Sequence, residues 1–227
     1  MTQFSRRSYP VGLPQVFYMA CQKFTRLDAP SGLHIVSSVN THNYNLASYL
    51  VGVFQLISTN QHTVKHSFRF ADWAKSSYKH NNGIMCSFDV CSLFTNVPLD
   101  ETIQICLDKL YALPESPAIP RPVLKKLLEF ATKKSHFISD GQYYDEIDGV
   151  AMGSPLGPVL ANIFMCDFEE KWIINSPRFR PTLWYRYVDD TFSMFDSKDS
   201  ANEFLNYGRH NYWIWTSRTD SVFGHCC

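Results

Sequence analysis

Two adjacent acids, Asp189 and Asp190, interrupt a stretch that is otherwise aromatic, β-branched or apolar, WYRYVDDTFSMF at residues 184–195. The residues on both sides favour β-strands, and a pair of aspartates is compatible with a tight turn. The stretch therefore predicts a β-hairpin with two carboxylates at its tip.

Two interpretations of these carboxylates are open at this point. In a solvated turn, aspartate side chains only bond to nearby backbone amides. In a divalent-metal site, a cation lies between carboxylates that would otherwise repel each other, and Mg²⁺ binds through such oxygen ligands. A further acid from another element would favour the metal site.

Asp89 is the candidate for that further acid. It lies near the end of an apolar stretch, IMCSFDV at residues 84–90, which predicts a strand. If one edge of a sheet carries Asp89, Asp189 and Asp190, these acids could hold two Mg²⁺ ions, with Mn²⁺ as a possible substitute. Such ions activate a primer 3′-hydroxyl and stabilise the departing pyrophosphate in phosphoryl transfer.

The elements expected to position these acids form a mixed α+β layout. Periodicity, capping and turn residues set their expected limits. In chain order they are a strand at 33–39, a helix with Asn45 as N-cap and Tyr49 on its apolar face, a helix at 68–78, the strand at 84–90, helices that open at Pro98 and Pro122, a hairpin at 136–147 with Asp140-Gly141 as its turn, a glycine-containing loop at 149–158 that leads into a helix, the hairpin at 184–195, and a short helix at 200–207.

Composition describes a globular chain of 227 residues, 45% hydrophobic, which is enough for one large domain or two small ones. Lys plus Arg equals Asp plus Glu at 21 each, so any nucleic-acid contact must come from local patches. The seven cysteines show no metal-ligand spacing and are interpreted as reduced thiols. Without a signal peptide or membrane span, we expect a soluble intracellular protein without a membrane partner, either nuclear or cytoplasmic.

Three segments in this order resemble motifs A, B and C of reverse transcriptases: SFDVCSLFTNVPLDETI, GVAMGSPLGPVLANIF and WYRYVDDTFSMF. Their wording resembles the Penelope-like retroelement group, which is related to telomerase reverse transcriptases, and LHIVSSVNTHNYNLASYL resembles the end of that group's fingers region. The resemblance implies a right-hand polymerase with a partial fingers region at 1–82, of which 1–28 match poorly, and a palm at 83–207. Residues 208–227 match nothing and are expected to lack a folded element.

The resemblance also implies roles for individual residues. Asp89 and Asp189 would bind the catalytic metals, with Asp190 beside them. Phe94 would lie against the incoming sugar and exclude a ribose 2′-hydroxyl, although an ordinary core phenylalanine is the alternative. The residues implied to approach the triphosphate, the nascent base pair or the template are Val90, Cys91, Ser92, Leu93, Met152, Gly153 and Ser154. The implied partners are an RNA template, a DNA primer and dNTPs, with the oligomeric state left undefined.

The sequence departs from the family at His34, where the fingers motif has an arginine that grips the triphosphate. An imidazole is mostly neutral at pH 7 and lacks the planar fork of arginine. Too few residues follow Asp190 for a thumb, so the expected fold is a palm with partial fingers and no thumb. Two functions stay open: an RNA-directed DNA polymerase domain of a retrotransposable element, or a degenerate or truncated copy without polymerase activity. Phe94 argues against a third, an RNA-dependent RNA polymerase.

Overall fold

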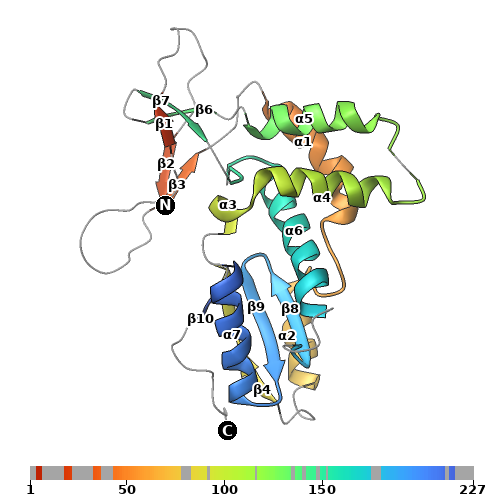
Figure 1. Ribbon diagram of the computed structural model, residues 1–227, viewed down its shortest axis with the longest axis vertical. Helices are drawn as coiled ribbons and strands as arrows, with labels where there is room; N and C mark the ends of the chain where they lie inside the picture. Colours follow the sequence, from red (N-terminus) through yellow and green to blue (C-terminus); the bar gives the residue numbers. More distant parts are fainter. Residues whose placement is uncertain are drawn as a thin grey trace. The chain divides into compact units, whose positions relative to one another are not determined.

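The chain folds into two compact units, each built from two separate stretches of sequence. The computed structural model describes residues 4–6, 18–21, 33–36, 43–77, 83–90, 93–115, 117–133, 136–139, 142–146, 149–151, 153–174, 180–212 and 215–217 (Figure 1). Unit 1 comprises Met1–Ser58 and Phe94–Phe164, and unit 2 comprises Thr59–Leu93 and Met165–Cys227. Helices and sheets are mixed, which confirms the α+β class.

Unit 2 is organised around the sheet that carries the acids. Its strands are β4 (Ile84–Cys86), β5 (Phe88–Val90), β8 (Leu183–Tyr187), β9 (Asp190–Phe195) and β10 (Trp215–Ser217). Strands β4 and β5 share one continuous register along one edge of β9, while β8 pairs with the other edge. Strand β10 pairs antiparallel with β5. The resulting order, β8-β9-β5-β10, together with the helices between the strands, is the β-α-β-β-α-β arrangement of a split βαβ fold.

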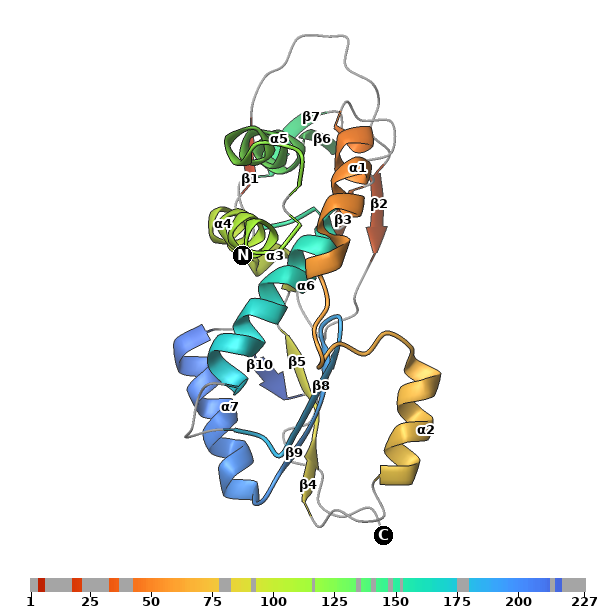
Figure 2. The same ribbon diagram turned by 90° about the vertical axis from the view of Figure 1, so that its right-hand side faces the viewer.

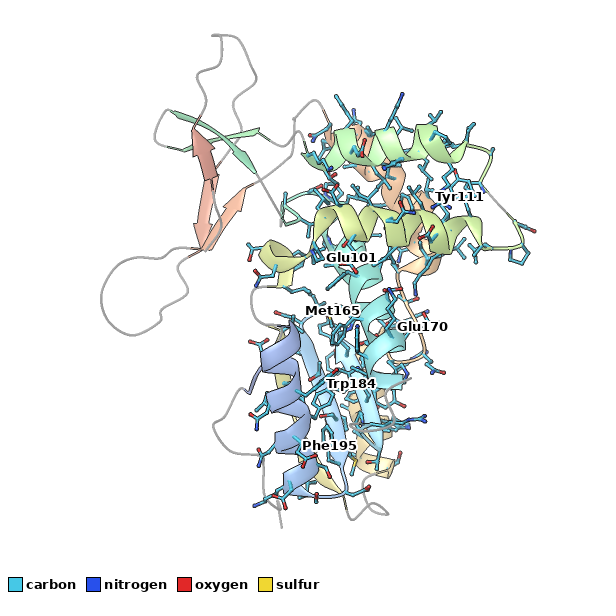
Figure 3. The ribbon with its side chains drawn as sticks, in the orientation of Figure 1. Glu101, Tyr111, Met165, Glu170, Trp184 and Phe195 are labelled. Carbon is cyan, nitrogen blue, oxygen red and sulfur yellow. The ribbon has the colours of Figure 1, made fainter. Side chains whose placement is uncertain are left out.

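One face of this sheet is covered by α7 (Lys198–Tyr212). The Phe204 ring of α7 lies 5.3 Å from Phe88, 5.3 Å from Phe195 and 5.7 Å from Trp184, measured between ring centroids. Figure 3 labels Trp184 and Phe195 on the strands beside this helix. Because alternate strand residues point to one face, these rings form a single apolar layer.

The opposite face is covered by α2 (Ser67–Ser77), and Figure 2 shows the sheet nearly edge-on between the two helices. Phe70 of α2 lies 5.3 Å from Tyr185 and 5.4 Å from Phe192, and Trp73 lies 4.8 Å from Tyr185. A sheet with both faces packed holds its strands rigidly, which suits a site built on strand ends.

Unit 1 is mainly helical. Its helices are α1 (Tyr44–Phe54) with the 3₁₀ turn η1 (Gln55–Ile57), α3 (Leu93–Asn96), which begins at the unit boundary, α4 (Leu99–Tyr111), α5 (Arg121–Lys133) and most of α6 (Gly157–Phe168), which continues into unit 2. Their core includes the fully buried Leu50, Phe54, Leu124 and Leu128. Two small sheets complete the unit: β1 (Phe4–Arg6) with β7 (Gln142–Glu146) and β6 (His136–Ser139), and β2 (Tyr18–Cys21) with β3 (Leu33–Val36).

The predicted helices near Pro98 and Pro122 and the predicted hairpin at 184–195 are confirmed. Three other expectations are wrong. Helix α1 begins one residue after Asn43, so Asn43 and not Asn45 is its N-cap residue, and the Asn43 side chain donates to the Ala131 carbonyl at 3.2 Å. Tyr49 is 58% exposed because α1 presents a different stripe to the core. Residues 208–227 do contribute folded elements, namely the end of α7 and strand β10. The predicted Asp140-Gly141 turn lies outside the described residues.

Three described cysteines, Cys86, Cys106 and Cys166, are buried and form no disulfide. Burial raises the pKa of the Cys86 thiol to about 11 and raises the pKa of Cys106 still further. The thiols of Cys86 and Cys106 are therefore neutral at physiological pH. In the part of the chain that the structure describes, no helix has the length and apolar character needed to cross a membrane.

Candidate metal and nucleotide site

The central sheet brings two distant acids together, because Asp89 of β5 and Asp190 of β9 are directly opposed cross-strand partners. Side chains at such positions have Cβ atoms roughly 4.5–5.5 Å apart, and like charges placed there destabilise the sheet. The adjacent turn is tied to the same place, since the Val90 amide donates to the Asp189 carbonyl at 3.1 Å. A cation between these carboxylates would relieve their repulsion.

Hydroxyl groups on β9 fix this register. Thr191 Oγ1 accepts a hydrogen bond from the Phe88 amide at 3.0 Å and donates to the Phe88 carbonyl at 2.8 Å. Ser193 Oγ donates to the Cys86 carbonyl at 3.1 Å. Both hydroxyl residues are buried, so water does not compete for these bonds. Thr191 thus fastens β5 to β9 one residue away from each acid of the opposed pair.

The turn that carries Asp189 has an unusual backbone conformation. Tyr187 pairs with Asp190, so Val188 and Asp189 alone connect β8 to β9. Val188 has φ +56°, and no other described residue except glycine has a positive φ. Two-residue hairpin turns favour glycine or asparagine at such positions, and a β-branched residue there costs about 1–3 kcal/mol. The surrounding structure must hold this turn in place.

A buried ion pair that the sequence interpretation missed lies next to the turn. Arg186 Nε donates to Glu169 Oε1 at 2.6 Å, and both side chains are 0% exposed. The sequence feature that could have indicated this pair is Arg186 itself, a lone arginine in an otherwise apolar strand. Because successive strand residues point to opposite faces, Arg186 lies on the same face as Trp184. Nothing in the sequence marked Glu169 as its partner.

The donor groups at the opposed pair fit a hard divalent cation. Carboxylate oxygens are the ligands of Mg²⁺ and Mn²⁺, and Mg²⁺ typically takes one or two carboxylates while keeping several waters. Asp190 Oδ1 is buried and accepts no hydrogen bond within the described residues, although Asp190 makes other interactions. No three described Asp, Glu, His or Cys side chains are grouped closely enough to hold one ion. The structure therefore brings Asp89 and Asp190 together, and Asp189 remains a predicted ligand in the adjoining turn.

The other predicted residues fall in different parts of the chain. Val90 is buried in β5, and Leu93 is buried at the start of α3. Gly153 and Ser154 lie in the loop before α6, where the Gly157 amide donates to the Ser154 carbonyl at 3.1 Å. Cys91, Ser92 and Met152 lie outside the described residues. The acids belong to unit 2, whereas Phe94, Gly153 and Ser154 belong to unit 1.

Within unit 1, the backbone of Phe94 is fixed by the start of the glycine-containing loop. The Val150 amide donates to the Phe94 carbonyl at 2.7 Å. Gly149 has φ +88°, and a Cβ atom there would lie 2.8 Å from the Phe94 carbonyl oxygen and 2.9 Å from Thr95. Only glycine allows this approach, so Gly149 is part of what positions Phe94.

Solved structures with a similar fold include telomerases and a viral RNA-dependent RNA polymerase. Apo telomerase from Candida tropicalis is 12% identical with a TM-score of 0.62, and the match covers 96% of this chain and 47% of that chain. Telomerase from Candida albicans, in complex with a TWJ fragment of telomeric RNA, is 12% identical with a TM-score of 0.54, covering 93% and 44%. The Sicinivirus 3Dpol RNA-dependent RNA polymerase is 14% identical with a TM-score of 0.59, covering 94% and 47%.

At these identities the likeness shows the fold alone, which is that of a polymerase palm. The chain spans about half the length of these structures. A search of curated protein sequences gives no significant match. The profile of the family described as "Reverse transcriptase (RNA-dependent DNA polymerase)" matches residues 32–210, which include Asp89, Asp189 and Asp190. Since this match covers well over half of the sequence, the chain belongs to the reverse transcriptase family.

Proposed function

We propose that this chain is an RNA-directed DNA polymerase domain that extends a DNA primer by two-metal nucleotidyl transfer. The observation that carries the proposal is the direct opposition of Asp89 and Asp190, beside the turn with Asp189, in a reverse transcriptase fold. Bound Mg²⁺ ions would activate the primer 3′-hydroxyl and stabilise the departing pyrophosphate.

In this proposal the strands supply a rigid set of carboxylates. Asp89 and Asp189 hold the ions, and Asp190 adds negative charge beside them. Val90 and Leu93 have buried side chains, so they offer a nucleotide only backbone groups. Together with Cys91 and Ser92, they form the segment whose backbone approaches the triphosphate. The Val90 amide is already bonded to the Asp189 carbonyl, so the donors to phosphate oxygens are the amides that follow it.

Phe94 would select the sugar of the incoming nucleotide. A bulky ring against the sugar leaves no room for a ribose 2′-hydroxyl, so dNTPs are favoured over rNTPs. The hydrogen bond from the Val150 amide to the Phe94 carbonyl supports this role, because it limits how far the Phe94 backbone can move away. Met152, Gly153 and Ser154 would contact the nascent base pair and the RNA template.

The wording of the three motifs supports an origin in a Penelope-like retrotransposable element. In that setting the partners are an RNA template, a DNA primer and dNTPs. The division into fingers at 1–82 and palm at 83–207 is part of the proposal. Unit 2 contains the palm sheet in this view. Besides the strands that carry the acids, unit 2 contains residues 59–82 and β10, which lie outside the 83–207 range.

Two alternatives each have a specific observation in their favour. An RNA-dependent RNA polymerase is favoured by the fold similarity to the Sicinivirus enzyme. A chain that keeps the palm fold without polymerase activity is favoured by His34, which stands in β3 where the related fingers motif has an arginine. Neither alternative changes the expected geometry of the acids.

Primer extension on an RNA template separates these functions. We expect extension with dNTPs in Mg²⁺ or Mn²⁺, and a loss of more than about 100-fold in Asp189→Asn, since even outer-shell partners of a metal cost 10- to 100-fold. Asp199→Asn, at an exposed position in the first turn of α7, is the matched control and should keep its activity. A preference for rNTPs over dNTPs would indicate an RNA-dependent RNA polymerase. A wild-type chain that is folded but extends no primer would indicate the second alternative, a palm fold without polymerase activity. Full activity in Asp189→Asn would contradict the proposed site.

A further inference from the structure

Arg186 has the largest side chain among the fully buried residues that the structure describes, and it carries a charge. Its partner Glu169 opens the π-helix η3 (Glu169–Ile174), which continues α6. Figure 3 shows this end of α6, near Met165 and Glu170, alongside the strand with Trp184. A buried ion pair is tolerated only when the remaining hydrogen-bonding groups of both partners are also satisfied.

Those groups are satisfied by neighbours from β8 and from the segment between η1 and α2. Glu169 Oε1 also accepts from Trp184 Nε1 at 3.2 Å, and Glu169 Oε2 accepts from Asn60 Nδ2 at 2.7 Å. The Arg186 amide donates to the His62 carbonyl at 2.9 Å, and the Arg186 carbonyl accepts from the Val64 amide at 2.8 Å. Backbone and guanidinium of Arg186 are thus both fixed.

The fixed guanidinium reaches the metal-site turn. Arg186 Nη1 donates to the Val188 carbonyl at 3.0 Å, and Val188 is the residue with φ +56°. A valine in this backbone conformation would relax if nothing held it. The bond from Arg186 therefore acts on the residue immediately before Asp189.

We propose that Arg186 is a positioning residue for the metal site. Oriented by Glu169, it holds the Val188-Asp189 turn in its left-handed conformation and so fixes the direction of the Asp189 carboxylate. The claim that Arg186 holds the turn depends only on the contacts described above. The claim that it affects metal binding also depends on the proposed function.

Arginine chemistry explains why this residue type is used. A planar guanidinium offers donors in several fixed directions, so one side chain can reach both a carboxylate and a carbonyl. Lysine can pair with Glu169 but cannot reproduce that fork. Stability alone would not require the pair, because well-packed apolar residues often replace buried ion pairs without loss.

Hydrogen–deuterium exchange of the full chain tests control of the turn. We expect Arg186→Lys to speed exchange of the Val188 and Asp189 amides by about tenfold or more, with little change in α4. Adding Val188→Asn should slow this exchange again, because asparagine tolerates positive φ. Arg121→Lys, in the exposed ion pair with Asp108, is the matched control and should leave the turn unchanged.

Unchanged exchange in a folded Arg186→Lys chain would overturn the proposal. A wild-type measurement decides the matter even if that variant fails to fold. By ¹⁵N NMR the Arg186 Nη protons should be protected from solvent, and fast exchange of these protons would also overturn the proposal.

Mn²⁺ titration, followed by electron paramagnetic resonance, tests the effect on the metal. We expect Arg186→Lys to weaken Mn²⁺ binding about 10- to 100-fold, in the range found for residues that orient metal ligands. A purely structural role would lower Tm without changing Kd. An unchanged Kd alongside faster turn exchange would overturn the metal half of the inference. A wild-type chain that binds no Mn²⁺ would instead refute the proposed function. In that case hydrogen–deuterium exchange would still test whether Arg186 holds the Val188-Asp189 turn.

Discussion

Replacing Thr191 by valine tests how the sheet holds its two acids in register. Valine has nearly the same shape as threonine but lacks the hydroxyl. That hydroxyl bonds both the amide and the carbonyl of Phe88, and Thr191 is only 4% exposed. The substitution therefore removes two buried hydrogen bonds without opening a cavity.

The expected cost follows from these two bonds. A buried polar group that loses its partner costs about 1–3 kcal/mol, and the added methyl group returns about 0.8 kcal/mol. We expect Thr191→Val to lower the free energy of unfolding by roughly 1–5 kcal/mol, most of it from the Phe88 backbone groups. Thr191→Ser keeps the hydroxyl and loses one methyl group, so it should cost only about 1 kcal/mol.

Urea denaturation followed by circular dichroism measures both values. A second readout is Mn²⁺ affinity, which should fall in Thr191→Val and stay near wild type in Thr191→Ser, because the hydroxyl fixes Asp89 opposite Asp190. Thr191→Val that is as stable as Thr191→Ser would refute the assigned role of the hydroxyl.

Two further predictions concern unit 1 and pH. Gly149→Ala should destabilise the chain by about 2–4 kcal/mol and weaken discrimination against rNTPs, because the added Cβ atom would displace the backbone of Phe94 and Thr95. Gly52→Ala on α1 is the control. A Cβ atom at Gly52 would have nothing within 4 Å, so this variant should stabilise the chain by up to about 1 kcal/mol. Destabilisation by Gly52→Ala equal to that of Gly149→Ala would contradict this explanation. Burial raises the pKa of Cys86 from 9.0 to about 11, so its contribution to stability is complete below pH 9 and is lost as pH rises to about 11. The free energy of unfolding should fall in this window by up to about 1.4 kcal/mol per pH unit, and Cys86→Ala should flatten that part of the profile.

The sequence was sufficient to predict the hairpin and the strand with Asp89, because strand-forming residues flank acids that have no place in an apolar core. It was not sufficient to predict the register. That register depends on the hydroxyls of Thr191 and Ser193, which bond to a strand about a hundred residues away. Threonine and serine are mostly found at exposed positions, so their residue types did not indicate buried hydrogen bonds.

The missed features share one cause, which is that partners distant in the chain decide them. Asn43 precedes α1 while its side chain bonds to α5, so local capping preference pointed to the wrong asparagine. Strand β10 is only three residues long, and its place is set by pairing with β5. Arg186 is explained by Glu169 on a helix extension that no sequence pattern links to the hairpin.

The most direct test of the metal site is a double-mutant cycle in Mn²⁺ affinity with Asp89→Asn and Asp189→Asn. Asp72→Asn, at an exposed position on α2, is the control. If both acids hold the same metal centre, each single variant weakens Mn²⁺ binding by more than about tenfold. The loss of binding free energy in the double variant is then far smaller than the sum of the two single losses. Additive losses, or no saturable Mn²⁺ binding by the wild-type chain, would contradict the account.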